Sequence, residues 1–158
     1  MPYRPHRHAA AALLVLALVA TSARAAESAA PSTPDTLSAA RAQIAAKKWP
    51  AAVAELKRVN DTGSAEWNNL MGYSLRKSAT PDYAAAEKHY DEALRIEPQH
   101  RGALEYSGEL YLITGNLPKA EARLAALDKA CRLPCEEYTD LKKSIERYKA
   151  NGNKVVAK

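Results

Sequence analysis

Two cysteines near the C-terminus are the residues whose spacing most directly suggests chemistry. Cys131 and Cys135 enclose Arg-Leu-Pro in the segment CRLPC. In an exported chain, two cysteines this close most simply form a disulfide, which would tie the end of one helical unit to the start of the last helix. The alternative is a redox-active pair, or a Cu(I) site if another soft ligand joins the two thiolates. The sequence does not contain the C-x-x-C-H pattern of haem attachment.

Other residue types that serve in catalysis are scarce. Beyond residue 25 the only histidines are His89 and His100, and no cysteine is near them in the sequence. Catalytic dyads and metal sites need several convergent groups. Ser107, between Glu105 and Glu109, more simply lets two helices approach each other while the acids face solvent. We therefore expect no enzyme, no catalytic residue, no metal and no cofactor.

The first residues, MPYRPHRHAAAALLVLALVATSARA, have the pattern of a secretory signal peptide. Two arginines precede an apolar run, and the alanines around Arg24 form an A-x-A cleavage site. The apolar run is shorter than the roughly 20 residues that a membrane span needs, which favours a cleaved signal peptide over the alternative, an uncleaved membrane anchor. We expect residues 1–25 to be removed, residues 26–35 to form a flexible linker, and the mature protein to be periplasmic.

Cleavage would also change the charge of the chain. The signal peptide contains three arginines and no acidic residue, so 20 of the 23 basic residues would remain against 18 acidic residues, a net charge of +2. No basic cluster with interleaved aromatic residues remains, which argues against a nucleic-acid partner. No segment after residue 25 is apolar and long enough to cross a membrane. The remaining 133 residues suffice for one small domain.

The region after the linker contains a repeat of 34 residues. Four apolar positions recur at this interval in three successive units. The recurring residues are Trp49, Tyr83 and Leu117; Ala52, Ala86 and Ala120; Leu56, Tyr90 and Leu124; and Val59, Ala93 and Leu127. A repeat of this length is typical of stacked helical units rather than of one globular core. The alanine column predicts a seam at which two helices come close together.

Apolar periodicity and turn residues predict seven helices. We expect them at residues 36–47, 50–59, 65–77, 83–96, 101–114, 118–130 and 136–150. Gly115 stands where a left-handed residue would end the fifth helix. Apolar residues from Tyr138 to Tyr148 form one stripe on the last helix, as expected of a helix that caps a repeat array. Residues 151–158 are expected to be a disordered tail.

The units resemble tetratricopeptide repeats. In the second unit, residues 65–100, Met71-Gly72 occupy the leucine-glycine position of the family and Pro98 the terminal proline. The further matches in this unit are Leu75, Tyr83, Ala86, Tyr90 and Ala93. The matches in the third unit, residues 101–134, are Ser107-Gly108, Tyr111, Gly115, Leu117, Ala120, Leu124 and Leu127. The third unit lacks the terminal proline.

The first unit, residues 36–64, is degenerate, because Ala39-Ala40 replace leucine-glycine although the second-helix pattern is kept. The resemblance implies an all-α fold, an antiparallel helix-pair solenoid of about three units with a capping helix at residues 136–150. Together with the signal peptide, it points to a secreted bacterial member of the tetratricopeptide repeat family.

The resemblance also implies where a partner would bind. In the family, the first helices of the pairs line a concave surface that holds an extended peptide or a partner helix. Carried over by position, this surface consists of Asn69, Tyr73, Arg76, Lys77, Glu105, Glu109 and Leu112. Asn69 would bond a peptide backbone, Tyr73 would offer a flat apolar ring, and Arg76 would hold a carboxylate with two hydrogen bonds.

Two interpretations of function follow. The preferred one is a non-catalytic periplasmic scaffold or adaptor that binds a peptide or partner protein of the cell envelope. The alternative is a small periplasmic redox or copper-handling protein that uses Cys131 and Cys135. Self-association through the first unit is a variant of the preferred interpretation.

Overall fold

The computed structural model describes residues 35–154, which form seven α-helices and contain no strand. The helices are α1 (Ser38–Ala45), α2 (Trp49–Val59), α3 (Ala65–Lys77), α4 (Tyr83–Ile96), α5 (Arg101–Ile113), α6 (Leu117–Ala130) and α7 (Glu136–Ala150). The predicted all-α fold class is confirmed. The chain divides into Met1–Thr33 and Pro34–Lys158, and all seven helices belong to the second unit. The predicted signal peptide, most of the predicted linker and residues 155–158 lie outside the described residues.

Side-chain caps hold the starts of α3 and α4 where the sequence predicts them, and the start of α6 at Leu117, one residue before the predicted one. Ser64, Asp82 and Asn116 accept backbone N–H groups from the first turns of α3, α4 and α6 at 3.2, 2.9 and 3.1 Å. These bonds satisfy donors that have no partner inside the helix. Gly115 follows α5 with a φ of 79°, which confirms the predicted left-handed terminator.

Helix α1 is shorter than the predicted range 36–47. Asp35 Oδ1 accepts the backbone N–H of Leu37 at 3.0 Å, which holds a turn before the helix begins. Lys47 has a φ of 55°, so the helical conformation has already ended there. The periodicity of apolar residues extends into both segments and does not reveal these local turns.

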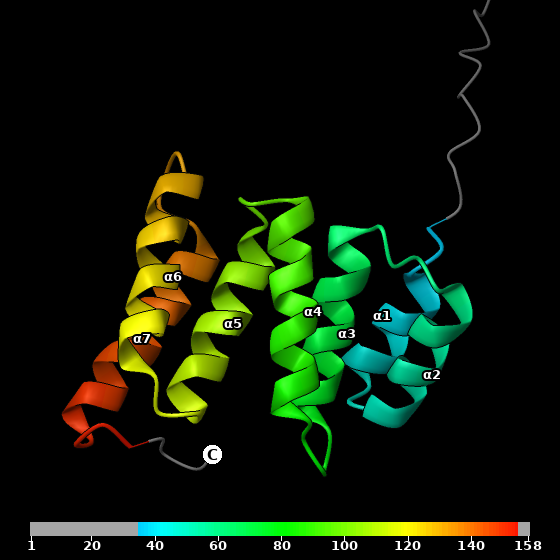
Figure 1. Cartoon of the computed structure of the whole chain (residues 1–158), viewed down its shortest axis with the longest axis horizontal. Helices are drawn as coiled ribbons and strands as arrows, with labels where there is room; N and C mark the ends of the chain where they lie inside the picture. The colour runs from blue at the N-terminus through cyan, green and yellow to red at the C-terminus, as the bar shows by residue number, and fades with distance from the viewer. Residues whose placement is uncertain (1–34, 155–158) are drawn as a thin grey trace, which may run out of the picture. The chain divides into compact units, whose positions relative to one another are not determined.

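The helices pack as pairs. Helix α1 contacts α2, α3 contacts α4, and α5 contacts α6, while α2 with α3 and α4 with α5 join successive pairs (Figure 1). The alanine column, Ala52, Ala86 and Ala120, is completely buried, as a close seam requires. In the second pair a Cβ atom at Gly72 would lie 2.9 Å from the Tyr90 ring, so glycine permits the close approach of α3 and α4.

Helix α7 covers the end of the array by packing against both α5 and α6. Its apolar stripe is buried through Leu141, Ile145 and Tyr148. A Cβ atom at Gly108 of α5 would lie 2.5 Å from the Leu141 side chain, so the glycine of the third unit admits the capping helix. The backbone N–H of Asn153 still donates to the Tyr148 carbonyl at 3.0 Å, so the hydrogen-bonded chain extends past the predicted start of the tail.

Within residues 35–154, no helix has the length and apolar character that crossing a membrane would require.

Candidate functional site

Three aromatic side chains form a row across three helices. The ring centroids of Trp49 and Tyr73 are 5.8 Å apart, and those of Tyr73 and Tyr106 are 4.6 Å apart. The residues come from the start of α2, the middle of α3 and the middle of α5. All three are half-buried. We call Trp49, Tyr73 and Tyr106 the aromatic row; its rings are held by one another and still expose part of their surface.

Arg76 packs against two of these rings, those of Tyr73 and Tyr106. Its guanidinium carbon lies 5.4 Å from the centroid of Tyr73 and 5.6 Å from that of Tyr106, which is the range of cation–π contacts. One guanidinium nitrogen is 2.9 Å from a carboxylate oxygen of Glu109. The residue is only 6% exposed, and its Nε has no hydrogen-bond partner among the described residues. Arg76 is therefore mainly a buried support that joins α3 to α5.

Carboxylates gather beside the end of the aromatic row. Glu105, Glu109, Glu137 and Asp140, which we call the acidic cluster, come from α5 and the first two turns of α7 and are all half-buried. Partial burial, together with the charges of Glu109, Asp140 and Glu137, raises the pKa of Glu105 to about 8 against the opposing charge of Arg76. The four side chains are thus close enough for their charges to interact.

The second helices present a different surface, made of charge pairs. Lys119 lies 3.1 Å from Glu87, and Arg123 lies 2.9 Å from Asp91, so α6 is joined to α4 by two ion pairs. Lys88, also on α4, is exposed. Such exposed pairs contribute little free energy each. Lys119 and Arg123 also cover the Tyr111 ring, with distances to its centroid of 4.7 and 5.6 Å.

The residues expected to form the binding surface separate into two groups. Tyr73, Glu105 and Glu109 are half-buried and lie together, and Lys77 is exposed at the end of α3. Asn69, Arg76 and Leu112 are buried, which contradicts their expected exposure.

Each buried residue has a local reason for its position. Asn69 lies against Gly102 of α5 and donates to Glu66 at 3.3 Å. Leu112 belongs to the apolar cluster that α5, α6 and α7 share, because the capping helix covers its side of α5. Arg76 is covered by the two tyrosines and bound to Glu109, so it does not offer its charge freely to a ligand carboxylate.

Sequence reasoning missed several residues of the site. Trp49 was assigned only to the apolar repeat, and Tyr106 occupies the position that the buried Leu70 has in the preceding unit. The only signal in the sequence was that both residues are aromatic and belong to helices that neighbour α3, the helix of Tyr73. Glu137 and Asp140 were assigned only to the cap, because no pattern in the sequence shows which side of α7 meets α5.

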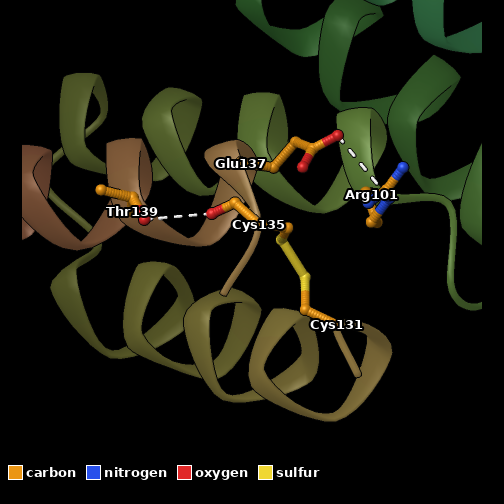
Figure 2. The surroundings of a disulfide bond; sticks show 5 residues. All are labelled: Arg101, Cys131, Cys135, Glu137 and Thr139. Atoms are coloured by element: carbon orange, nitrogen blue, oxygen red, sulfur yellow. Dashed lines mark hydrogen bonds and ion pairs between the residues drawn. A yellow bond between two sulfur atoms is a disulfide. The ribbon is translucent and has the colours of Figure 1, made fainter. Parts of the chain in front are cut away.

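The cysteine pair forms a second feature, at the junction of α6 and α7. A disulfide links Cys131 and Cys135, whose Cα atoms are 5.9 Å apart. Figure 2 shows it beside the first turn of α7, where Thr139 donates to the Cys135 carbonyl at 3.0 Å and Arg101 lies 3.6 Å from Glu137. The loop borders a shallow cavity of about 580 Å³. The cavity is lined by Arg101 and residues 130–137.

The two histidines serve the structure of their surroundings. His89 Nδ1 is 3.0 Å from the amide oxygen of Asn68. His100 Nδ1 accepts the Ala103 N–H at 3.1 Å as a helix cap, and its Nε2 is 3.2 Å from Glu66. In the part of the chain that the structure describes, no three His, Cys, Asp or Glu side chains converge as metal ligands.

Comparison with known proteins bears on the repeat assignment. A family model described as tetratricopeptide repeat matches residues 81–145, which run from the turn before α4 into α7. No curated protein and no solved structure matches the chain. The matched helices carry Ala86 and Ala120 of the alanine column and the contact of Gly108 with Leu141 of the capping helix. Over residues 81–145 the chain is thus similar to tetratricopeptide repeats, and the pairing of its helices agrees with a helical-repeat solenoid.

Proposed function

We propose that this protein is a non-catalytic interaction module of the periplasm and that a peptide or partner protein of the cell envelope docks on the aromatic row. The observation that supports the proposal is the row itself. Half-buried tyrosine and tryptophan rings bury much apolar area while few rotatable bonds become fixed, and such residues dominate binding energy at interfaces. Tyr73 and Tyr106 stand 4.6 Å apart on successive first helices, so one ligand segment can contact both.

Site-specific cross-linking in cells tests this location. A photoreactive amino acid placed at Tyr106 should give a discrete adduct with one partner, whereas the same group at exposed Lys88 on α4 should not. Mass spectrometry of the adduct would then identify the contacting segment. Equal adducts from both positions, or an adduct from position 88 alone, would place the interface away from the aromatic row.

Export is the second part of the proposal. We infer that residues 1–25 direct secretion and that the mature chain begins at Ala26. The two arginines, the apolar run and the A-x-A site motivate this inference, and the Cys131–Cys135 disulfide is compatible with it, because disulfides persist mainly in oxidising compartments. Osmotic shock should release a protein whose intact mass starts at Ala26. Recovery of the full-length chain in the membrane fraction would refute cleavage.

The alternative function is redox or copper handling by Cys131 and Cys135. It is favoured by one observation, the position of the disulfide at the border of the cavity. Thiol titration of protein taken from the periplasm, with and without reductant, distinguishes the two functions when combined with metal analysis. Bound copper, or a pair that is reduced as isolated, would favour the alternative over the interaction module.

A further inference from the structure

The acidic cluster lies along one stripe of α5 and the adjoining turns of α7. Arg101, Glu105 and Glu109 are spaced four residues apart, so they follow one face of α5. Arg101 lies 3.6 Å from Glu137, which brings the first turn of α7 against this face. Asp140 is one turn further along α7 and lies on the same side as Glu137. The carboxylates therefore border the seam between α5 and α7.

The neighbours of the cluster pair with three of its four carboxylates. Arg76 is 2.9 Å from Glu109 and Arg101 is 3.6 Å from Glu137. Lys143, an exposed residue, reaches Asp140 only at 3.9 Å. No ion pair within residues 35–154 includes Glu105. Burial and the three neighbouring carboxylates raise the pKa of Glu105 to about 8, so Glu105 is ionised mainly above that pH, and a cation placed beside it would favour its ionised form.

The aromatic row adjoins this negative charge. Tyr106 follows Glu105 in α5, and its ring lies 4.6 Å from that of Tyr73. Tyrosine faces attract cations, and Arg76 already adopts this geometry within the protein. A lysine or arginine side chain has an apolar stem that suits the rings and a charged end that suits the carboxylates. The two neighbouring features thus select the same kind of side chain.

We propose that the segment that docks on the aromatic row is cationic, with lysine or arginine side chains that cross Tyr73 and Tyr106 and end at Glu105 and Asp140. The inference rests on the proposed function, because it names the chemistry of the partner at the same surface. It reverses the polarity expected from the sequence, in which Arg76 was to receive a carboxylate. Arg76 is already paired with Glu109 and covered by the rings of Tyr73 and Tyr106, so it is not available to a ligand carboxylate.

Defined peptides test the chemistry directly. The probes are an alternating Lys-Ala peptide and a Glu-Ala peptide of the same length, measured by calorimetry against the mature protein at pH 9, where Glu105 is ionised, and at low and at high salt. The Lys-Ala peptide should bind, with an affinity that falls as salt rises. Glu105→Gln and Asp140→Asn should each weaken it by about threefold or more. Tyr106→Leu, which keeps an apolar side chain, should weaken it by about fivefold.

Matched controls separate docking from general attraction between opposite charges. Glu146→Gln on α7 and Asp128→Asn on α6 make the same charge changes at exposed positions and should bind like the wild type. Unfolding curves must show that every variant is folded. If the controls weaken the Lys-Ala peptide as much as Asp140→Asn does, or if Tyr106→Leu has no effect, the assignment of a cationic segment is overturned.

The remaining outcomes distinguish this inference from the proposed function. If the Glu-Ala peptide binds more tightly and Tyr106→Leu weakens it, the aromatic row is a docking surface but its partner is not cationic. If position 106 cross-links to a segment without lysine or arginine, the cationic inference fails and the proposed function stands. If no peptide binds and position 106 gives no adduct, both fail.

Discussion

The pKa of Glu105 depends on the helices that pack around it. Partial burial is the first cause that raises its pKa to about 8, and nearby Glu109, Asp140 and Glu137 add to the effect. Its assignment to the first-helix surface came from the resemblance to tetratricopeptide repeats. The resemblance did not allow prediction of the shift, since Glu137 and Asp140 approach only after α7 packs on α5. The exposures of Asn69, Arg76 and Leu112 were wrong for the same reason, because burial depends on neighbouring helices.

The raised pKa of Glu105 predicts a pH dependence of stability. Between its ordinary pKa of 4.5 and about 8, the folded state holds more protons at this site than the unfolded state. The contribution of Glu105 to stability is therefore complete below pH 4.5 and is lost as the pH rises through 8. Glu105→Gln has no titratable group at this position. Between pH 5 and pH 8 its free energy of unfolding should therefore fall by about 1 kcal/mol less than that of the wild type, after allowance for the exposure of the group.

Urea unfolding of both proteins at pH 5, 6.5 and 8 measures this effect as the difference between their free energies of unfolding. Glu146→Gln, at an exposed position of α7, is the control and should follow the wild type. Groups other than Glu105 titrate in both proteins and cancel in the difference. Parallel curves for Glu105→Gln and the wild type would show that its carboxyl group is not perturbed.

At the scale of the helices, the sequence predicted the number, order and approximate bounds of all seven. Repeated apolar columns and polar caps are local signals, so they can be recognised without knowledge of the tertiary structure. The role of Gly108 was different. The repeat pattern placed Gly108 at the seam within its own helix pair, whereas in the structure a Cβ atom at Gly108 would meet the side chain of Leu141 of α7. Contacts made by a cap are outside the repeat, and the repeat spacing therefore does not predict them.

The alanine column gives a test of helix packing. Ala86 is completely buried, and its carbonyl oxygen would lie 3.1 Å from a Cβ atom at Gly72. Ala86→Leu should overpack the seam between α3 and α4 and lower the free energy of unfolding by about 1–3 kcal/mol. Ala84→Leu, on the exposed side of α4, is the matched control and should have little effect. An Ala86→Leu variant as stable as its control would disprove the close seam.

The disulfide gives a test of the junction between α6 and α7. Replacing Cys131 and Cys135 with serine removes a link across four residues of sequence separation. Because the loop is short, the loss of stability should be below about 3 kcal/mol. Hydrogen exchange should quicken around the start of α7 and stay unchanged in α3 and α4, since repeats interact mainly with their neighbours. Faster exchange throughout all helices would contradict a local role.

At the scale of the whole molecule, the repeats bring residues from separate units into one surface. Trp49, Tyr73 and Tyr106 are far apart in the sequence, and stacked pairs place their rings within 5.8 Å of a neighbour. The family pattern predicted that first helices form a surface but not which side chains remain exposed on it. The same stacking gives the second helices a surface of ion pairs, so the two sides of the array differ in chemistry.

The most direct test of partner docking is the affinity of the protein captured from position 106 for four forms of this chain. The forms are the wild type, Tyr73→Ala, Tyr106→Ala and Lys88→Glu, compared by calorimetry where all are folded. Each alanine variant should lose about 1 kcal/mol or more of binding free energy, because a ring at the contact is removed, while Lys88→Glu should bind like the wild type. Unchanged affinity in both alanine variants, together with a loss in Lys88→Glu, would contradict docking on the aromatic row.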